Sequence, residues 1–428
     1  MKELFNPKTV ALIGATDRPG SVGLGIAKNL LLGKNKRKIF FINPSKKKIL
    51  GQKAFASILD IKEKTDLAII AVPAKFVQQV SQECCQAKAG SCIIISSGFA
   101  EAGKGGVILQ KEIKELFAKN NIPLVGPNCL GIINPLAKLN ASFAPETPKQ
   151  GSIAFLSQSG ALIDSIIDKS LLENFGFSLM VSYGNEAGML LSDFLKIASQ
   201  DKATKVIAVY LEEIKNGQEF IKVSKEITKQ KPIIVLKGGK TEVGKLAAQS
   251  HTASLAGDEK IYSAAFKKAG LIEVETIRDL FLTSQVLSIY RNRVAGNWAI
   301  LTNGGAVGVI TADWCSRFGV RLAGVWDILG DANTQKYQES LLSLLKQKEI
   351  NGVIFCQTLQ TMTNPQQNAK IIIQAQKRFP KKPILPLFLG GKITKNGSDF
   401  LSKNRLVCFN EPRDIALCAK ILSQHDKS

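Results

Sequence analysis

The sequence predicts an α/β protein made of three consecutive units, each built on a mainly parallel β-sheet. Short apolar runs typical of buried strands alternate with amphipathic, helix-like segments along all 428 residues. Each unit also opens in the same way, with a strand that runs into a glycine-bearing turn and then a helix. Units of roughly 130–150 residues match the usual size of a domain.

The first unit is expected to span residues 1–133. Its helices are expected near 76–87 and 107–119, between apolar runs that read as strands. Those runs are 10–14, 39–43, 67–73, 92–97 and 123–128. The following segment, 134–150, is rich in proline and polar residues, so it is interpreted as a linker.

The second unit is expected to span 151–290, and the third 296–428 with a join near 289–298. Strands of the second unit are expected at 153–157, 177–184, 206–213, 232–239 and 270–275. Strands of the third are expected at 298–305, 320–324, 352–357, 383–391 and 406–410.

Composition and charge limit the kinds of ligand and partner that this protein is expected to bind. Lysine and arginine (57) outnumber aspartate and glutamate (35), which gives a net charge of +22. This charge suits a polyanionic ligand or a lysine-rich solvated surface. The basic residues are scattered, and the short clusters at 34–38 and 46–48 contain no interleaved aromatic residues, so no nucleic-acid partner is expected.

The eight cysteines show neither a CxxC pair nor Cys/His spacing typical of a metal site. They are interpreted as reduced, mostly buried thiols, and no metal ligands are assigned. The N-terminus lacks the long apolar stretch of a signal peptide, and no window approaches the ~18 apolar residues of a membrane span. We therefore expect a soluble cytoplasmic protein with no membrane partner.

Glycine-bearing turns offer candidate anion sites, because backbone N–H groups and the following helix N-terminus can approach a negative charge. The first turn lacks the GxGxxG spacing of dinucleotide-binding proteins, since Gly14, Gly20, Gly23 and Gly25 do not fit it. A nicotinamide-dependent oxidoreductase is therefore a weaker alternative. The second expected strand also ends in Asn43 rather than an acidic residue.

The second unit gathers polar groups after successive strands, where parallel sheets bind ligands. Ser159 and Gly160 follow one strand, and Asn185 and Glu186 follow the next. A carboxylate pair, Glu212 and Glu213, follows a third strand, with the stretch 237–240 beyond. These residues predict two anion-binding turns and a carboxylate at one edge of the sheet.

His251 is the most informative single residue. It is one of two histidines, and the other, His425, stands three residues from the C-terminus and is expected to be a solvated tail residue. Small polar residues surround His251, so it is expected in a polar loop. A carboxylate bound to one ring nitrogen would leave the other free as a nucleophile toward a phosphoryl group.

The string SHTASLAGD at 250–258, with AAFKKAG at 264–270, resembles the phosphohistidine segment of ADP-forming acyl-CoA synthetases, the acetate–CoA ligases. These enzymes are similar to the succinyl-CoA synthetase α subunit. The resemblance extends over essentially the whole chain through VALIGATDRPGSVG, GPNCLGIINP, FLSQSGAL and SLMVSYGNEAGM. It implies a Rossmann-like CoA-binding domain followed by two flavodoxin-like, succinyl-CoA-ligase-like domains.

The resemblance also implies roles for individual residues. Asn128 stands where the family places the thiol end and acyl group of CoA. The other expected CoA-binding residues are Gly14, Ala15, Thr16, Gly23, Asn43, Pro44, Val72, Pro73, Ser96, Ser97 and Gly98. Cys129 is interpreted as structural, because the family has a small residue there and its chemistry passes through the histidine.

For catalysis, the resemblance implies that His251 carries the phosphoryl group and that Glu212 orients it. Glu213 is an alternative for the second role. Ser159, Gly160, Asn185 and Glu186 would bind phosphate mainly through their backbone. The implied reaction is acyl-CoA + ADP + phosphate ⇌ carboxylic acid + CoA + ATP, by way of an acyl phosphate and a phosphohistidine.

No segment resembles the ATP-grasp nucleotide domain of this family. The chain is therefore expected to be an α subunit whose ATP-grasp β partner binds ADP or ATP and Mg²⁺, in an α2β2 assembly. The substrates would be a small carboxylic acid and phosphate. The third domain looks shortened near 319–335, which leaves a non-catalytic, CoA-binding regulatory protein as the other alternative.

Overall fold

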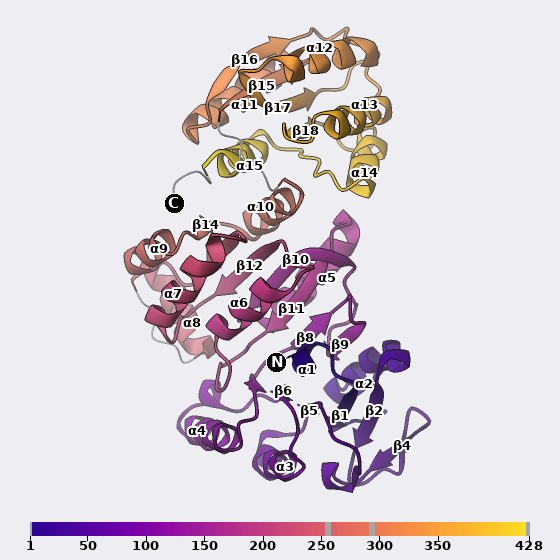
Figure 1. Ribbon diagram of the computed structural model, residues 1–428, viewed down its shortest axis with the longest axis vertical. Coiled ribbons are helices and arrows are strands. Elements are labelled where there is room, and N and C mark those ends of the chain that lie inside the picture. Colours follow the sequence, from indigo (N-terminus) through magenta and orange to yellow (C-terminus); the bar gives the residue numbers. More distant parts are fainter. Residues whose placement is uncertain (1, 253–257, 291–295, 425–428) are drawn as a thin grey trace. The chain divides into compact units, whose positions relative to one another are not determined.

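The computed structural model describes residues 2–252, 258–290 and 296–424 (Figure 1). The chain divides into two compact units. Unit 1 comprises Met1–Leu172 and Gly176–Glu275, and unit 2 comprises Glu173–Phe175 and Thr276–Ser428.

The first half of unit 1 contains a sheet that, within the described residues, has seven strands in the order β3-β4-β2-β1-β5-β6-β7. All pairs are parallel except β3 with β4. The strands are β1 (Thr9–Ile13), β2 (Lys38–Ile42), β3 (Lys48–Ile49), β4 (Gln52–Phe55), β5 (Leu67–Ile70), β6 (Cys92–Ile94) and β7 (Leu124–Val125). The helices are α1 (Lys2–Phe5), α2 (Val22–Leu32), α3 (Ala74–Gln86) and α4 (Lys104–Lys119), with 3₁₀ turns η1 (Lys34–Lys36), η2 (Ile58–Asp60) and η3 (Ala100–Ala102).

Local sequence accounts for these elements. The uninterrupted apolar run of β5 is buried throughout, as expected for a central parallel strand. Helix α2 begins where the Ser21 side chain accepts a hydrogen bond from the Leu24 N–H, and α3 begins directly after Pro73. The α/β class predicted from the alternating pattern is confirmed.

The second half of unit 1 contains a sheet whose described strands run β14-β13-β12-β10-β11-β8-β9. The strands from β14 to β11 are parallel, and β8 and β9 add an antiparallel hairpin. The strands are β8 (Gly131–Asn134), β9 (Leu139–Ser142), β10 (Gln150–Ser157), β11 (Phe177–Ser182), β12 (Val206–Leu211), β13 (Ile233–Lys237) and β14 (Ile272–Val274). The helices are α5 (Gly160–Glu173), α6 (Leu191–Gln200), α7 (Gly217–Thr228), α8 (Glu242–Thr252) and α9 (Glu259–Lys268).

The segment 134–150, expected as a linker, is structured instead, because it contains strand β9. Leu139 and Ala141 are buried in the core. The Asn29 side chain donates hydrogen bonds to the carbonyl oxygens of Ser142 (2.9 Å) and Ala144 (2.8 Å). The prolines that suggested a linker flank this short strand, and the hairpin with β8 satisfies its backbone.

One hydrophobic core runs through both halves of unit 1. It joins Leu12 and Val125 of the first sheet to Ile132 and Leu156 of the second. The chain crosses from the first sheet to the second through 126–130, between β7 and β8. This crossing places residues of both halves side by side, and the candidate site lies there.

Unit 2 holds a parallel sheet whose strand order in the described chain is β16-β15-β17-β18. Its strands are β15 (Asn297–Thr302), β16 (Leu322–Asp327), β17 (Ile350–Gln357) and β18 (Ile384–Phe388). Its helices are α10 (Ile277–Ile289), α11 (Gly305–Arg317), α12 (Thr334–Lys346), α13 (Pro365–Arg378), α14 (Lys395–Lys403) and α15 (Pro412–Gln424). The expected strand at 406–410 is reduced to a single bridge between Phe409 and Leu387.

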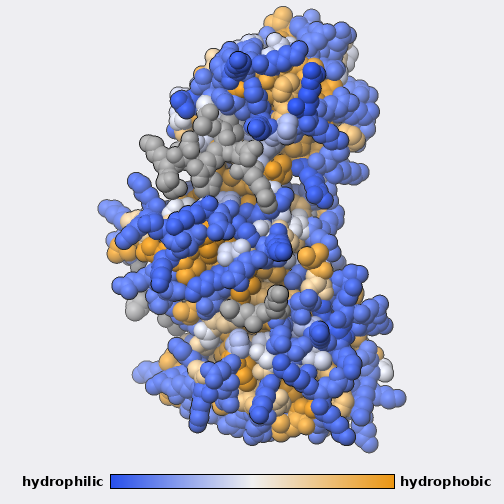
Figure 2. Space-filling view, in the orientation of Figure 1, coloured by the Kyte–Doolittle hydropathy of each residue, from blue (hydrophilic) through white to orange (hydrophobic). Residues whose placement is uncertain are grey.

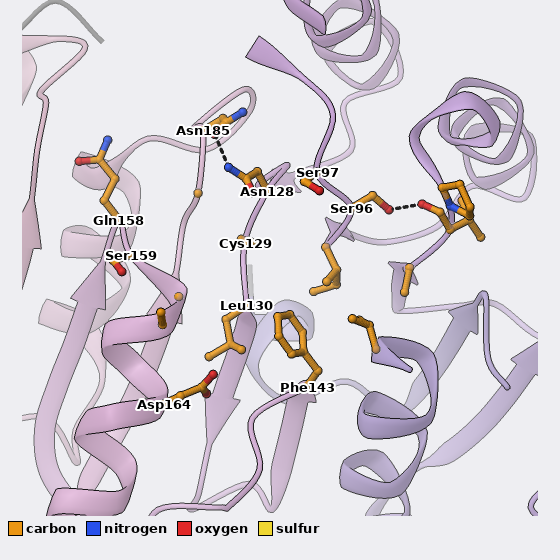
Figure 3. Close-up of a pocket in the computed structure, with 18 residues that line it drawn as sticks. Ser96, Ser97, Asn128, Cys129, Leu130, Phe143, Gln158, Ser159, Asp164 and Asn185 are labelled. Atoms are coloured by element: carbon orange, nitrogen blue, oxygen red, sulfur yellow. Dashed lines mark hydrogen bonds between the residues drawn. The ribbon is translucent and has the colours of Figure 1, made fainter. Parts of the chain in front are cut away.

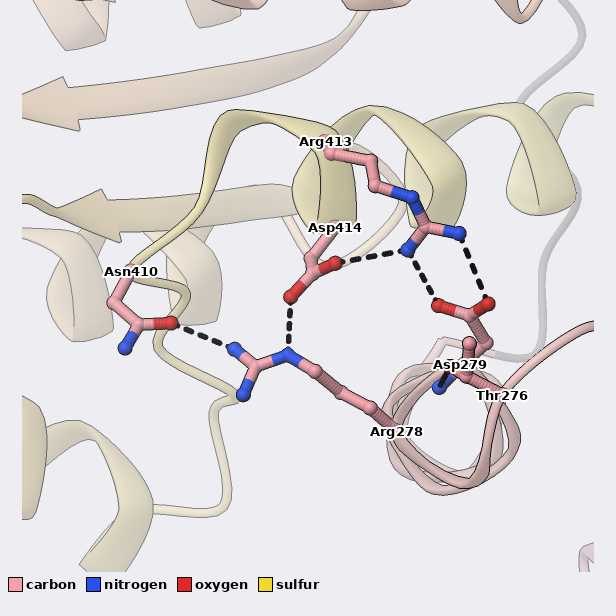
Figure 4. Close-up of polar contacts among 6 residues, drawn as sticks. All are labelled: Thr276, Arg278, Asp279, Asn410, Arg413 and Asp414. Carbon is pink, nitrogen blue, oxygen red and sulfur yellow. Dashed lines mark hydrogen bonds and ion pairs between the residues drawn. The ribbon is translucent and has the colours of Figure 1, made fainter.

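Helix α10 was expected to end the second domain, but it belongs to unit 2. Buried Asp279 of α10 pairs with Arg413 of α15 through two N–O contacts of 2.6 and 3.0 Å. Arg278 pairs with the neighbouring Asp414 and also donates to Asn410 (2.7 Å). Figure 4 shows these contacts, which link the two helices. The domain limits as a whole remain a prediction.

The surface reflects the basic composition. Figure 2 shows mostly hydrophilic side chains on the face in view, with smaller hydrophobic areas between them. Within the described residues, no helix combines the length and apolar composition that crossing a bilayer requires. All eight cysteines are free thiols, and seven of them are buried.

Candidate functional site

Unit 1 contains a cavity of about 550 Å³ beside the crossing segment between β7 and β8. Both halves of the unit contribute to its wall (Figure 3). Eight of the site residues predicted from the sequence line it: Val72, Pro73, Ser96, Ser97, Asn128, Ser159, Gly160 and Asn185. The structure therefore brings Asn128, expected at the thiol end of CoA, and residues of both expected phosphate turns to a single pocket.

The two ends of the pocket differ in chemistry. Asn128 and Asn185 lie at one end, where the Asn128 Nδ2 donates to the Asn185 Oδ1 over 3.2 Å. Leu130, Phe143 and Asp164 lie at the other end (Figure 3). The first end can bind polar groups of a ligand, and the second presents apolar surface around one carboxyl group.

The turn before α5 is built to hold its backbone at the pocket. The Ser157 hydroxyl donates to the Ser159 carbonyl oxygen (2.7 Å) and accepts from the Ser159 N–H (3.1 Å). The Ser159 hydroxyl accepts from the Leu162 N–H (3.3 Å), so it caps the helix. The N-terminus of α5 lines the cavity at Gly160 and Ala161, and helix N-termini favour anions.

Sequence reasoning did not assign Gln158, although it stands in the same turn. Its side-chain oxygen accepts hydrogen bonds from the backbone N–H groups of Glu212 (2.6 Å) and Glu213 (3.1 Å). Gln158 also lines the pocket, so it connects the wall of the pocket to the carboxylate pair. Its position directly before the predicted phosphate-binding residues Ser159 and Gly160 was the available signal.

Sequence reasoning also missed Asp164, which lies one helical turn after Gly160 and therefore on the same face of α5. The Oδ1 of Asp164 is buried without a hydrogen-bond partner among the described residues. Burial raises the pKa of this carboxyl group to about 6, because the charged form loses hydration.

The raised pKa predicts a pH-dependent stability effect of Asp164→Asn. Because the pKa of Asp164 is higher in the folded state than its ordinary value of 3.8, ionisation of this group destabilises the fold. The loss of stability is fully present above about pH 6 and absent below the ordinary pKa of 3.8. The variant should be more stable by about 1 kcal/mol at pH 7.5, a figure reduced because the side chain is only half-buried. Urea unfolding followed by far-UV circular dichroism at several pH values measures this.

The matched control for that prediction is Asp168→Asn, one turn further along α5, where the side chain is exposed. It removes the same charge and should change stability by less than about 0.5 kcal/mol. An equal gain from both variants, or a gain for Asp164→Asn that persists at pH 4, would show that burial of Asp164 is not the cause.

Glu212, expected to orient the catalytic histidine, is buried with 9% of its surface exposed. Its Oε1 accepts from the Tyr210 hydroxyl over 3.3 Å, whereas its Oε2 has no hydrogen-bond partner among the described residues. Burial lowers the pKa of nearby Lys237, and the charge of Glu212 opposes this shift. Glu213 is half-buried. Glu212 therefore has a free acceptor atom for another donor.

Glu186 does not line the pocket. Its side chain is buried and accepts a hydrogen bond from the Leu191 N–H at the start of α6 (2.6 Å). Burial raises the pKa of this carboxyl group to about 7, although the Leu191 N–H and the charge of Lys215 favour the ionised form. Its side chain thus serves the local structure of the turn, and phosphate binding there through the backbone stays a prediction.

Several predicted CoA-binding residues cluster at the first turn instead of lining the pocket. A Cβ on Gly14 would lie 2.2 Å from the Ala71 carbonyl oxygen, and a Cβ on Gly23 would lie 2.2 Å from that of Gly14, so only glycine fits both positions. The Asn43 side chain donates to the Ala15 carbonyl oxygen over 2.9 Å and ties the ends of β1 and β2 together. The residues that do not line the cavity are Gly14, Ala15, Thr16, Gly23, Asn43, Pro44 and Gly98.

His251 lies in the last turn of α8, whereas the sequence suggested a loop. Its side chain, residues 253–257 of the motif, and His425 fall outside the part of the chain that the structure describes. Groups of three or more potential metal ligands were also not found among the described residues.

Cys129 has the environment of a structural residue. Its Sγ donates to the Ile94 carbonyl oxygen over 3.3 Å, and the side chain is buried. Burial raises the pKa of the thiol to about 12, so it stays protonated at neutral pH and is a poor nucleophile.

Two protein-family models match the chain in the order that the fold shows. A CoA-binding domain matches residues 8–135, and a succinyl-CoA ligase-like flavodoxin domain matches residues 150–287. Strand β9 lies between the two matches, and strand β8 lies at the end of the first. The residues that line the cavity come from both matched domains.

Similar proteins agree with these matches. The α subunit of ADP-forming acetate–CoA ligase II from Pyrococcus furiosus is 36% identical, over 99% of this chain and 97% of its own. ADP-forming acetate–CoA ligase I from Archaeoglobus fulgidus is 37% identical over 100% of this chain, which spans 64% of that relative's length. That alignment covers 448 positions, so this chain lacks some positions that the relative has.

The fold matches a solved enzyme as well. The dinucleotide-forming acetyl-coenzyme A synthetase 1 of Candidatus Korarchaeum cryptofilum, solved with phosphate and ADP, has a TM-score of 0.94 and 32% identity, covering 98% of this chain and 96% of that one. With both domains matched in order and nearly the full length of an α subunit covered, this chain belongs to the ADP-forming acetate–CoA ligase family and corresponds to its α subunit.

Proposed function

We propose that this chain, with a partner subunit, interconverts acyl-CoA, ADP and phosphate with a carboxylic acid, CoA and ATP. Phosphate attacks the thioester carbonyl carbon, the C–S bond breaks, and CoA leaves as its thiol. His251 then attacks the phosphorus of the acyl phosphate, which releases the carboxylate. Finally, ADP takes the phosphoryl group from the histidine and restores the free imidazole.

The pocket is the observation that carries this proposal. It puts the N-terminus of α5, which suits phosphate, beside Asn128, which is expected at the thiol end of CoA. Phosphate attack on a thioester needs these two groups within one enclosed space. Fixed backbone N–H groups stabilise the developing charge without the reorganisation that water requires. Partial enclosure also limits hydrolysis of the acyl phosphate.

For phosphoryl transfer, we infer that Glu212 orients His251. The free Oε2 of Glu212 can accept a hydrogen bond from one imidazole nitrogen and leave the other nitrogen nucleophilic. Gln158 supports this role because it holds the Glu212 backbone from the wall of the pocket. The histidine motif supplies the assignment of His251.

This assignment predicts different effects of two neighbouring substitutions. Glu212→Gln keeps the shape of the side chain but weakens its attraction for an imidazole N–H, so phosphorylation should slow by about 100-fold. Glu213→Gln should slow it by no more than about threefold. Single-turnover labelling with each purified variant measures both rates, and the reverse ranking would move the role to Glu213.

The partner is inferred from the family. Similar chains are named α subunits, and we propose an ATP-grasp β subunit that binds ADP or ATP with Mg²⁺, in an α2β2 assembly. A small carboxylic acid such as acetate is the proposed acyl substrate. The nucleotide-binding chemistry would then lie on the partner.

The test uses this chain co-purified with its candidate ATP-grasp partner. Incubation with acetyl-CoA and radiolabelled phosphate should release CoA and label this chain in an acid-labile, base-stable form. Subsequent addition of ADP should move the label into ATP. Binding of CoA without any label or turnover would instead support a non-catalytic, CoA-binding regulatory protein.

A further inference from the structure

Asn185 lies between the two halves of unit 1 and is held by two residues of the first half. Its Nδ2 donates to the Oε2 of Glu101 over 2.5 Å and to the Oε1 of Gln110 over 3.0 Å. Its Oδ1 accepts from the Nδ2 of Asn128 over 3.2 Å (Figure 3). Glu101, Asn185 and Asn128 thus form a chain of side chains that ends in the pocket wall.

The carboxylate sets the direction of this chain, because an ionised glutamate only accepts hydrogen bonds. The other oxygen of Glu101, Oε1, already accepts from the backbone N–H groups of Gly98 (2.7 Å) and Phe99 (3.1 Å). Burial opposes ionisation of Glu101, but these bonds and the one from Asn185 lower its pKa overall. Asn185 must therefore turn its amino group toward Glu101 and its carbonyl oxygen toward Asn128.

Gln110 reinforces the same orientation. Its Oε1 accepts from the Ala100 N–H over 3.3 Å as well as from Asn185, so turning its amide around would lose the backbone bond. Asn128 in turn uses its amino group toward Asn185. The Oδ1 of Asn128 has no hydrogen-bond partner among the residues that the structure describes, and Asn128 lines the pocket.

We propose that Glu101 is a positioning residue that fixes the amide direction of Asn185 and Asn128, so that Asn128 presents its carbonyl oxygen to a hydrogen-bond donor at the thiol end of CoA. The donor is the thiol of free CoA or the adjacent amide N–H of the pantetheine arm. This inference rests on the proposed function, since it assumes that the pocket binds that end of CoA.

Glu101→Gln tests the proposal, because the new side chain has nearly the same shape. Its oxygen can keep the bonds to Gly98 and Phe99, but its amino group then faces the amino group of Asn185. Either these two amino groups repel each other, or both asparagine amides reverse. In the second case the amino group of Asn128 faces the hydrogen-bond donor at the thiol end of CoA. We expect the Kd for CoA to rise about tenfold, the loss of roughly one hydrogen bond.

A truncated ligand separates positioning from general damage. 3′-Phosphoadenosine 5′-diphosphate carries the nucleotide part of CoA but no pantetheine or thiol. Calorimetric titration should give the same Kd for this ligand, within about twofold, for wild type and Glu101→Gln. Glu115→Gln, an exposed substitution on α4, is the matched control and should change neither Kd.

A second variant tests the direction of the hydrogen bonds. Combining Glu101→Gln with Asn185→Asp exchanges carboxylate and amide without changing net charge. Gln110 can turn to donate, at the cost of the bond that it accepts from the Ala100 N–H. The carboxylate introduced at position 185 can accept from the new amide at position 101 and from Gln110. It also accepts from Asn128, which therefore keeps its own carbonyl oxygen in the pocket. The double variant should recover CoA affinity to within about threefold of wild type.

The outcomes separate the two hypotheses. An unchanged Kd for CoA in Glu101→Gln, an equal loss for both ligands, or no recovery in the double variant would overturn the positioning role. A wild-type chain that binds neither ligand would overturn the proposed function, and the positioning role with it.

Discussion

Replacing His251 with alanine is expected to remove the phosphoryl label from the chain and to lower turnover by at least about 1,000-fold. The imidazole is the only proposed carrier between the acyl phosphate and ADP, and the neighbouring hydroxyl groups are weak nucleophiles at neutral pH. Labelling with acetyl-CoA and radioactive phosphate, in the presence of the partner subunit, measures the first effect. Release of ATP measures the second.

The second histidine supplies the control for that result. His425→Ala should keep the label and full turnover, because His425 has no place in the proposed reaction. CoA affinity should be unchanged in His251→Ala, since the pocket residues are intact. Label that persists in His251→Ala would reject this histidine as the carrier and leave CoA binding as the function that the pocket supports.

Replacing Arg413 with alanine is expected to destabilise unit 2 by about 3 kcal/mol. Asp279 is only 1% exposed, and it receives both of its close charge-assisted contacts from the Arg413 guanidinium. Removing one partner of a buried ion pair leaves an uncompensated charge, which typically costs ~3–5 kcal/mol. The lower figure applies here because Arg413 itself is 35% exposed and partly hydrated.

Tryptophan fluorescence can follow this change selectively. The three tryptophans of the chain, Trp298, Trp314 and Trp326, all belong to unit 2. Urea unfolding of the full chain should show an earlier fluorescence transition for Arg413→Ala. The apolar pair Asp279→Leu with Arg413→Met should restore most of the stability, since replacing both charges removes the unpaired group. A double variant as unstable as the single one would assign the loss to packing of the arginine stem.

The sequence predicted the strands well where burial alone determines them. The runs that form β1, β5 and β12 are apolar enough to exclude other structures, and they were expected within a few residues of their observed limits. Strand β9 was missed because proline and polar residues surround its four residues, and only its hydrogen bonds to a neighbouring strand reveal it. Phe409 forms one bridge where a whole strand was expected.

The sequence also predicted only part of the candidate site, because some of its residues can be recognised only in the folded chain. Ser159, Asn185 and Asn128 were found through polar turns and the family motif. Glu101 and Asp164 carry no such signal, because a single acidic residue in a loop or on a helix looks like an ordinary solvated group. The contact of Glu101 with the distant residue Asn185 and the burial of the Asp164 carboxyl group are visible only in the folded chain.

The unbroken apolar core beneath both sheets of unit 1 restricts how this enzyme can work. A hinge motion that separated the CoA-binding half from the ligase half would expose buried side chains such as Val125 and Ile132 to water. Under the proposed function, the pocket walls that would receive the thioester should therefore keep their spacing throughout a catalytic cycle. The proposed phosphoryl carrier would then have to come to this fixed pocket, rather than the pocket to the carrier.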